Sequence, residues 1–282
     1  ILDVPGPPVA SVQQLTIESR DGYPINARLY KPLEFAEISG PQPVLLYFHG
    51  GGYCLGSLDS HDSLCRSLAA STPCHVLHVA YRLAPEHRFP GAVHDAHDAY
   101  RWLLAQGSAH GLDTKRIAVG GDSAGGTLAA GIAITARDEN RQPPACQILL
   151  YPCTSAWQTS GSHQRLATGY LLEAATLQWM FKLYLRGDAD RTDWRFAPLE
   201  TPDLSKLAPA YFALAEYDPL LDEGIAYAER LQASGVAAQV KVYPGMVHDF
   251  ARLGNIVEET DRVRQDLAKI LAGVFYTDSD RR

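Results

Sequence analysis

Five residues in the middle of the chain have the types and spacing of a catalytic nucleophile. The stretch Gly121-Asp122-Ser123-Ala124-Gly125 fits G-x-S-x-G, in which a serine lies on a sharp turn between a strand and a helix. A serine hydroxyl is a weak nucleophile, so it must be exposed, oriented and close to a base. The apolar residues before the motif predict a strand. The small residues after it predict a helix whose N-terminus faces the site.

A second glycine-rich motif could supply the oxyanion hole of such a nucleophile. His49-Gly50-Gly51-Gly52 resembles the HGGG motif, in which closely spaced backbone N–H groups reach a ligand oxygen. The alternative is a flexible glycine turn. The motif directly follows 44–48, an apolar run typical of a strand buried on both faces, and this position favours the oxyanion hole. We expect His49 to fix the loop through hydrogen bonds rather than act as the base.

A serine nucleophile also needs a base and an acid, and both follow it in the chain. Asp218 and His248 each come just after a predicted strand, on the edge where Ser123 is expected. Imidazole gains and loses a proton near neutral pH, so His248 is the candidate base. Asp218 would orient that imidazole. Asp222 is the alternative acid, but it falls near the first turn of a helix, where it would help to cap.

These residues must be positioned by a regular succession of strands and helices. Buried strands alternate with helical patterns, which predicts an α/β fold with a mostly parallel sheet and helices on both faces. The alternation breaks from Thr154 to about Arg195. This part holds one amphipathic helix over 174–185, and we predict that residues 155–195 form a cap over the site. The alternative is an ordinary core helix.

The composition of the chain excludes several classes of protein. The chain has 282 residues, enough for one large α/β domain, and a net charge of −7 without a basic block, which argues against nucleic acid. No apolar run reaches the length of a membrane span, and no secretory signal opens the sequence. The five cysteines contain no C-x-x-C pair. We therefore expect no metal site and no disulfides, and a cytoplasmic location.

Five motifs in this order carry a family resemblance over most of the chain, from Leu15 to Leu271. HGGGY, YRLAPEHRFPGAVHDA, GGDSAGG, EYDPLLDEG and GMVHDF resemble those of the hormone-sensitive-lipase-like carboxylesterases, a bacterial family with GDSAG at its serine. The resemblance implies an α/β-hydrolase core of about eight strands with a cap, and no cofactor. It implies a triad of Ser123, Asp218 and His248, and oxyanion donors from Gly51, Gly52 and Ala124.

One feature departs from that family. Its members usually have about two cap helices before the first strand, whereas only a short proline-rich segment precedes it here. We interpret residues 1–14 as the remnant of an N-terminal cap.

The predicted function is that of a serine carboxylesterase. It would hydrolyse small-molecule esters with short- to medium-chain acyl groups through an acyl-enzyme. An amidase or arylformamidase using the same triad is the first alternative, since the triad does not specify the leaving group. A non-catalytic ligand-binding relative is the second, although such proteins typically lack a triad residue. A homodimer could form through a predicted edge strand over 239–243.

Overall fold

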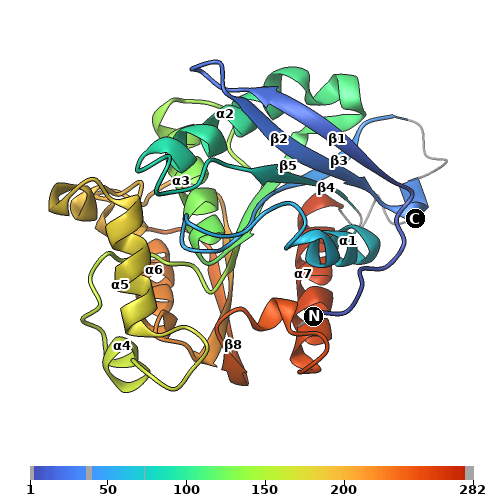
Figure 1. Ribbon diagram of the computed structural model, residues 1–282. Coiled ribbons are helices and arrows are strands. Elements are labelled where there is room, and N and C mark those ends of the chain that lie inside the picture. Colours follow the sequence, from blue (N-terminus) through green and yellow to red (C-terminus); the bar gives the residue numbers. More distant parts are fainter. Residues whose placement is uncertain (1–2, 36–39, 73, 277–282) are drawn as a thin grey trace.

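An eight-stranded sheet forms the centre of the protein (Figure 1). The structure is a computed structural model, and it describes residues 3–35, 40–72 and 74–276. The strand order is β1-β2-β4-β3-β5-β6-β7-β8, so β1 and β8 are the edges. The strands are β1 (Ser11–Glu18), β2 (Pro24–Lys31), β3 (Gln42–Phe48), β4 (His75–Ala80), β5 (Leu112–Asp122), β6 (Gln147–Leu150), β7 (Ala210–Tyr217) and β8 (Ala238–Val247).

The sheet is parallel from β4 to β8, and only β2 pairs antiparallel, with β1 and β4. Asp21-Gly22 is a sequence typical of a hairpin turn, and it joins β1 to β2 at the edge of the sheet that β1 forms. Residues Pro43–Phe48 of β3 are all buried, as expected for a central strand covered on both faces. The mostly parallel α/β fold is therefore confirmed, and the carboxyl ends of six parallel strands meet at one edge.

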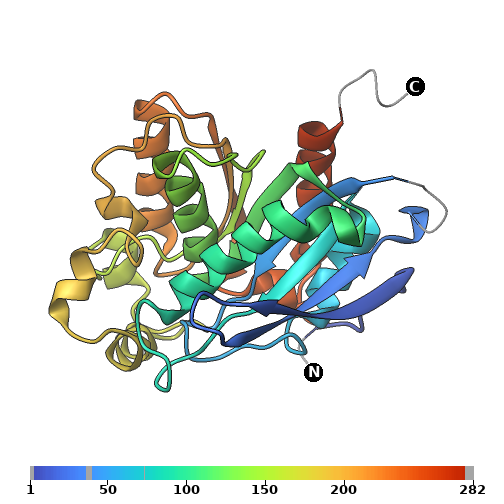
Figure 2. The ribbon, with the colours of Figure 1, turned by 90° about the horizontal axis from the view of Figure 1, so that it is seen from above.

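Helices cover both faces of the sheet (Figure 2). The face with α1 (Asp62–Ser71) and α7 (Glu259–Phe275) holds one apolar cluster. The opposite face holds the other cluster, under α2 (Gly91–Gln106), α3 (Ala124–Asp138) and α6 (Leu221–Ala233). Apolar residues at helical spacing predict helices at 61–71, 91–105, from the serine motif to about 137, at 221–231 and at 263–271. The first four agree with the structure to within two residues, and α7 extends four residues further at each end.

The segment between β6 and β7 is the irregular part of the chain. It contains α4 (Gly161–Arg165), α5 (Ala174–Tyr184) and two 3-10 turns, η3 (Asp188–Thr192) and η4 (Pro198–Glu200). The amphipathic pattern over 174–185 predicted α5 to within one residue, whereas α4 is too short to leave a periodic signal. In Figures 1 and 2, α4 and α5 lie at one end of the molecule, where α4 packs against α6 through hydrogen bonds between Ser162 and Asp222.

Two boundaries differ from those expected. The sequence Asp113-Thr114-Lys115 is typical of a turn and predicts one there, but these residues lie inside β5. The register between β3 and β5 shifts there, and the Lys115 N–H donates to Asp113 Oδ1 at 2.9 Å, so the turn signal marks an irregularity within the strand. β8 continues to Val247 past Pro244-Gly245, because the Gly245 N–H bonds Glu216 beside it and Tyr217 still pairs with Val247.

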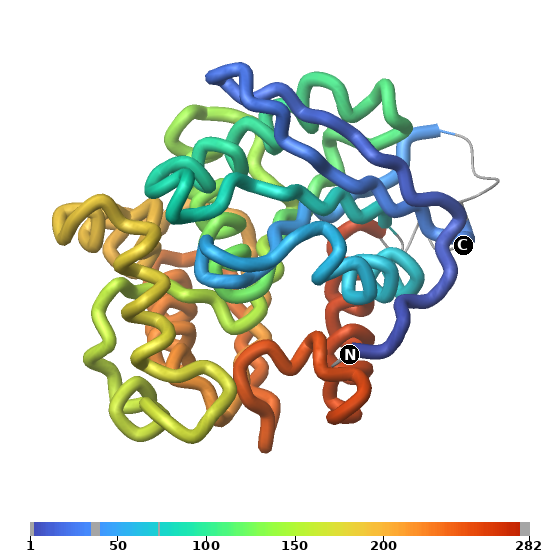
Figure 3. The backbone as a smooth tube through the Cα atoms, in the orientation of Figure 1, coloured from blue at the N-terminus to red at the C-terminus, as the bar shows by residue number. Residues whose placement is uncertain are grey.

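The N-terminal segment runs across α1 and α7 before it enters the sheet (Figure 3). Asp3 forms an ion pair of 2.7 Å with Arg264 of α7, and Ser63 of α1 donates to the Val4 carbonyl at 2.6 Å. Within the expected segment 1–14, residues 11–14 are the start of β1.

Candidate active site

The predicted site residues gather around one cavity at the carboxyl edge of the sheet. The cavity has a volume of about 330 Å³. It is bounded by the glycine loop after β3, the turn after β5, the segment after β8 and helix α5. Its lining includes Gly50, Gly51, Gly52, Asp122, Ser123, Leu171, Leu172, Leu177, Met180, His248, Asp249 and Arg252. Residues separated by up to 200 positions in the sequence therefore face the same space.

Ser123 lies on the sharp turn between β5 and α3 that its motif predicts. Its backbone adopts φ 52° and ψ −120°, a strained conformation for a residue with a side chain. The surroundings explain why both flanking positions are glycine. A Cβ on Gly125 would overlap the carbonyl of Phe48, and a Cβ on Gly121 would overlap Gly125. The turn thus packs backbone against backbone, which holds Ser123 at the cavity.

The glycine loop after β3 has the conformation that its residues permit. Gly51 and Gly52 both have positive φ, at 113° and 58°. A Cβ on Gly51 would overlap the Leu55 carbonyl, and a Cβ on Gly52 would overlap the Met180 sulfur of α5. Ala124 is the first residue of α3, where backbone N–H groups have no partner within the helix. The cavity is thus bordered by backbone that side chains do not shield.

His49 lies behind this loop and not in the lining of the cavity. Its ring stacks on Tyr81, with centroids 4.4 Å apart, and its Nδ1 lies 2.8 Å from the Gly50 carbonyl. Burial lowers the pKa of His49 to about 4. A buried neutral imidazole that hydrogen-bonds the loop agrees with the expected structural role.

The candidate base and acid are in direct contact. His248 Nδ1 lies 2.7 Å from Asp218 Oδ2, and the other carboxylate oxygen accepts the Leu220 N–H at 2.9 Å. Burial by itself lowers the pKa of His248, but the Asp218 carboxylate, together with the nearby Asp249 and Asp122, more than offsets this and raises that pKa above its usual value. Asp222 lies in the first turn of α6 and accepts the Ser162 N–H at 2.6 Å. Its carboxylate therefore binds the segment between β6 and β7 rather than His248.

Some residues around the cavity left no usable signal in the sequence. His61 and Arg252 line the same cavity as Ser123, yet neither belongs to a motif, and Asp249 was marked only by its place beside His248 in GMVHDF. Met180 was predicted only as part of the apolar face of α5. Asp122 was expected as a member of the serine motif, and the structure adds its buried contacts to the Gly50 N–H and His61.

Metal-ligating residue types do not gather in the part of the chain that the structure describes. No group of three or more His, Cys, Asp or Glu residues there could hold a metal ion. All five cysteines are free; Cys54 is half-buried and the others are buried.

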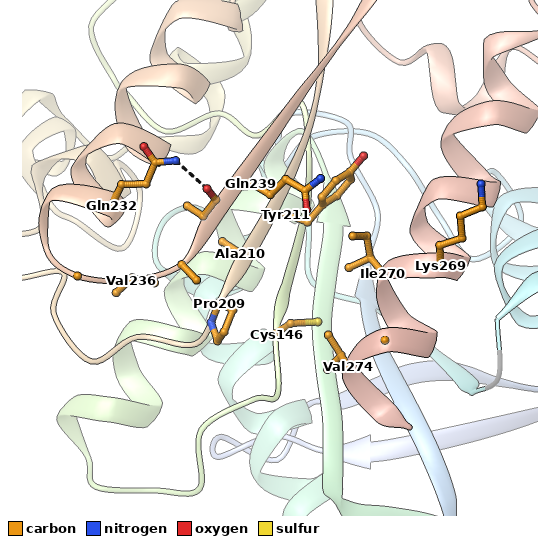
Figure 4. A pocket seen from close by; sticks show the side chains of 14 residues that line it. Cys146, Pro209, Ala210, Tyr211, Gln232, Val236, Gln239, Lys269, Ile270 and Val274 are labelled. Atoms are coloured by element: carbon orange, nitrogen blue, oxygen red, sulfur yellow. Dashed lines mark hydrogen bonds between the residues drawn. The ribbon is translucent and has the colours of Figure 1, made fainter. Parts of the chain in front are cut away.

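A second, larger hollow lies away from these residues. This open groove of about 740 Å³ is lined mainly by apolar residues at the beginning of β7 and β8 and along α7 (Figure 4). Lys269 is the only charged residue among those that line it. The hydrogen bond drawn there runs from the Gln232 side chain, in the last turn of α6, to the Ala238 carbonyl at the start of β8. The groove therefore has volume but no convergent reactive groups.

Comparison with known proteins gives a consistent result. A family model described as the alpha/beta hydrolase fold matches residues 45–252. The chain is 48% identical over 252 residues to an ethyl acetate hydrolase of Pseudomonas putida, covering 89% of this chain and 79% of that protein. It is 37% identical over 248 residues to an arylesterase of Saccharolobus solfataricus, covering 88% and 79%.

Solved structures agree with this similarity. An α/β-hydrolase enzyme from the metagenome of Lake Arreo superposes with a TM-score of 0.94 at 38% identity, covering 98% of this chain and 86% of that chain. An esterase of Pyrobaculum calidifontis gives a TM-score of 0.89 at 39% identity, covering 94% and 86%. With the sheet order, the nucleophile turn and these similarities together, the chain belongs to the α/β-hydrolase family.

Proposed function

We propose that this protein is a serine carboxylesterase in which Ser123 is the nucleophile, His248 the general base and Asp218 the residue that orients it. The observation that carries the assignment is the 2.7 Å contact between His248 and Asp218 beside a cavity that Ser123 also lines. A carboxylate on Nδ1 leaves Nε2 to take the proton of a serine hydroxyl. The relatives named above, an ethyl acetate hydrolase and an arylesterase, support ester hydrolysis as the reaction.

The reaction would proceed in two acyl transfers. His248 Nε2 removes the Ser123 hydroxyl proton as Oγ attacks the ester carbonyl carbon, and a tetrahedral oxyanion forms. The C–O bond to the alcohol then breaks, and His248 returns the proton to the departing alkoxide. Water repeats both steps on the acyl-enzyme, releasing the carboxylic acid and restoring Ser123. Asp218 stays ionised and stabilises the imidazolium that forms in each half-reaction.

The oxyanion would be stabilised by the backbone N–H groups of Gly51, Gly52 and Ala124. Two features support this part of the proposal. Gly51 and Gly52 line the cavity beside Ser123, and Ala124 begins α3, whose N-terminal dipole favours negative charge. Each donor of such a hole contributes about 10²–10³ in rate. Since the donors belong to the backbone, their position depends on the packing of the glycine loop.

The size of the cavity and its apolar side favour small esters. Its volume of about 330 Å³ lies at the lower end of the range for ligand pockets. The side formed by the insertion is apolar, with Leu171, Leu172, Leu177 and Met180. We therefore propose short- to medium-chain acyl esters as substrates, with residues 155–195 acting as the cap. No observation favours an amide over an ester.

Location and assembly complete the proposal. Within the described residues, no helix is both long enough and apolar enough to cross a membrane. Five free cysteines suit a reducing compartment, so we place the enzyme in the cytoplasm. β8 is an edge strand of ten residues with exposed Val242, which could pair with a second copy in a homodimer.

The test compares wild type with Ser123→Ala on p-nitrophenyl butyrate and p-nitrobutyranilide. An organophosphate with intact-mass analysis reports whether Ser123 is activated. Ester turnover that the substitution abolishes, with one adduct located on Ser123, is the expected result. Faster anilide than ester turnover would instead identify an amidase. If the folded protein gave neither turnover nor adduct, the catalytic assignment would be wrong.

A further inference from the structure

A charged cluster borders the cavity on the side opposite the apolar cap residues. It consists of Asp249 and Arg252, after the candidate base, and of His61 and Asp122. Arg252 lies in the 3-10 turn η5 (Phe250–Arg252). Its Nε donates to Asp249 Oδ1 at 3.0 Å, and its Nη2 lies 3.0 Å from Oδ2, so the two side chains form a bidentate pair.

The remaining nitrogen of Arg252 reaches a different part of the chain. Nη1 donates to the Ser60 carbonyl at 3.3 Å and lies 3.0–3.1 Å from the ring nitrogens of His61, which directly precedes α1. Because Nη1 is almost equally far from both ring nitrogens, the guanidinium packs over the face of the imidazole. In the plane of the ring, Nδ1 lies 2.9 Å from the Ser60 hydroxyl and Nε2 faces Asp122. One side chain thus joins the segment after β8 to the start of α1.

His61 extends this connection to the nucleophile turn and the oxyanion loop. Its Nε2 lies 3.2 Å from Asp122 Oδ2, and the same oxygen accepts the Gly50 N–H at 3.0 Å. The Tyr47 hydroxyl donates to the other oxygen at 2.7 Å. Burial raises the pKa of Asp122, but the neighbouring His61 and Arg252 more than offset this, and the pKa stays below its usual range. Asp122 is therefore a fully bonded anion between Ser123 and Gly50.

The other end of the connection is attached next to the base. Asp249 follows His248 directly and has φ 69°, in the left-handed region, which Asp enters more readily than most other residues with a side chain. Its two carboxylate oxygens are the ones that Arg252 binds. Holding Asp249 in this conformation fixes the direction in which the backbone presents His248.

We propose that Arg252 is a positioning residue: it ties the segment carrying His248, through Asp249 and His61, to Asp122 and thereby to the oxyanion loop and Ser123. The inference rests on the proposed function. In this arrangement one series of contacts joins the loop that carries His248, the turn that carries Ser123 and the glycine loop after β3, whose relative positions determine the geometry of the site. A displacement of about 1 Å at such a site can cost about 100-fold in rate, so the loss of Arg252 lowers kcat rather than substrate binding.

The test measures kcat and KM on p-nitrophenyl butyrate for Arg252→Met, Arg252→Lys and the control Arg116→Met. Arg116 forms a comparable pair with Asp113, three positions away, far from the cavity in β5. We expect kcat to fall about 10-fold to 100-fold in Arg252→Met with KM within about twofold, partial recovery in Arg252→Lys, and little change in the control. A raised KM with unchanged kcat would overturn the proposal, because Arg252 would then contact substrate.

A double-mutant cycle with His61→Gln tests the connection itself. If Arg252 acts through His61, the double variant loses no more than about the larger single loss; additive losses would contradict the proposal. Circular dichroism and thermal melting establish whether each variant is folded. If Arg252→Met does not fold, the kinetic comparison of Arg252→Lys with wild type decides the test. Failure of the proposed function is distinguishable, since wild type would then show no Ser123-dependent turnover at all.

Discussion

His248 Nδ1 and Asp218 Oδ2 lie 2.7 Å apart, and both side chains are more than nine-tenths buried. Two residues thirty positions apart meet because β7 and β8 are parallel neighbours, so the residues that follow them emerge at the same edge. A buried carboxylate needs partners, and Asp218 has the imidazole on one oxygen and the Leu220 N–H on the other. The contact therefore fixes the tautomer and the orientation of His248 together.

Replacing this carboxylate should remove most of the activity while leaving the fold intact. In Asp218→Asn the amide can keep a contact to His248 but favours the wrong tautomer, and we expect kcat to fall by about 10⁴. The matched control is Asp222→Asn, which alters the carboxylate that binds the Ser162 N–H and should change kcat less than about tenfold. Steady-state kinetics on p-nitrophenyl butyrate measures both. A larger loss in Asp222→Asn would transfer the acid role to that residue.

The pH profile of the same variant gives an independent prediction. Burial lowers the pKa of His248, but Asp218, the largest of the opposing contributions, together with Asp249 and Asp122 more than offsets this, so the pKa of this imidazole is raised in the wild type. Activity requires the neutral imidazole, so kcat/KM falls as the pH drops through that pKa. Without the carboxylate, burial remains and the pKa decreases. The acid limb of the residual activity in Asp218→Asn should therefore move to lower pH; an unmoved limb would mean that Asp218 does not set this pKa.

The fold was largely predictable because its signals are local. β3 is apolar throughout and α5 has an apolar stripe, and both lie where these patterns place them. The errors occurred where tertiary contacts override a local signal. Asp113 and Gly245 are turn-forming residues, yet pairing with neighbouring strands keeps both inside β5 and β8. α4 has only five residues and depends on Ser160 as its cap, so no periodicity could reveal it.

The candidate site was predictable only where a motif carries the chemistry. The glycines of the serine motif and of the HGGG motif have a fixed spacing that can be read from the sequence. The structure explains why glycine is needed, because backbone atoms approach Gly125 too closely for a side chain. Their catalytic roles, like those of Asp218 and His248, stay predictions until activity is measured. Arg252 and His61 are 191 positions apart, and their contact depends on how η5 packs against α1, which no local pattern encodes.

Two glycines of α3 should respond oppositely to the same substitution. A Cβ at Gly125 would overlap the Phe48 carbonyl and crowd that of His49, whereas a Cβ at Gly131 would meet nothing within 4 Å. We expect Gly125→Ala to lower the free energy of unfolding by about 1–3 kcal/mol and to reduce kcat by displacing the oxyanion loop. Gly131→Ala should raise it by about 0.5–1 kcal/mol, because alanine is the better helix former.

Urea denaturation monitored by tryptophan fluorescence measures the free energy of unfolding of both variants. The value of kcat on p-nitrophenyl butyrate is measured for each variant as well. Gly131→Ala serves as the control for adding a methyl group to this helix. Equal effects of the two substitutions would show that the close approach of the Phe48 carbonyl does not constrain Gly125.

Helix α5 should control which esters fit the cavity, through Met180. This side chain is 8% exposed, lines the cavity and contacts Gly52 of the oxyanion loop, whereas its neighbour Trp179 is 53% exposed on the outer side of α5. Shortening Met180 to alanine removes three heavy atoms from the wall. We expect Met180→Ala to raise the kcat/KM ratio of a larger over a smaller ester about tenfold, the discrimination typical of an apolar pocket.

The measurement uses two series, acyl chains from acetate to octanoate on one alcohol and alcohols of increasing size on one acyl group. Met180 borders only part of the cavity, so the shift should appear in one series and not in both. Trp179→Ala, a larger truncation on the same helix, should leave both series unchanged because its ring faces away from the cavity. A Met180→Ala profile that matched wild type in both series, in a protein that still melts cooperatively, would mean that α5 does not limit substrate size.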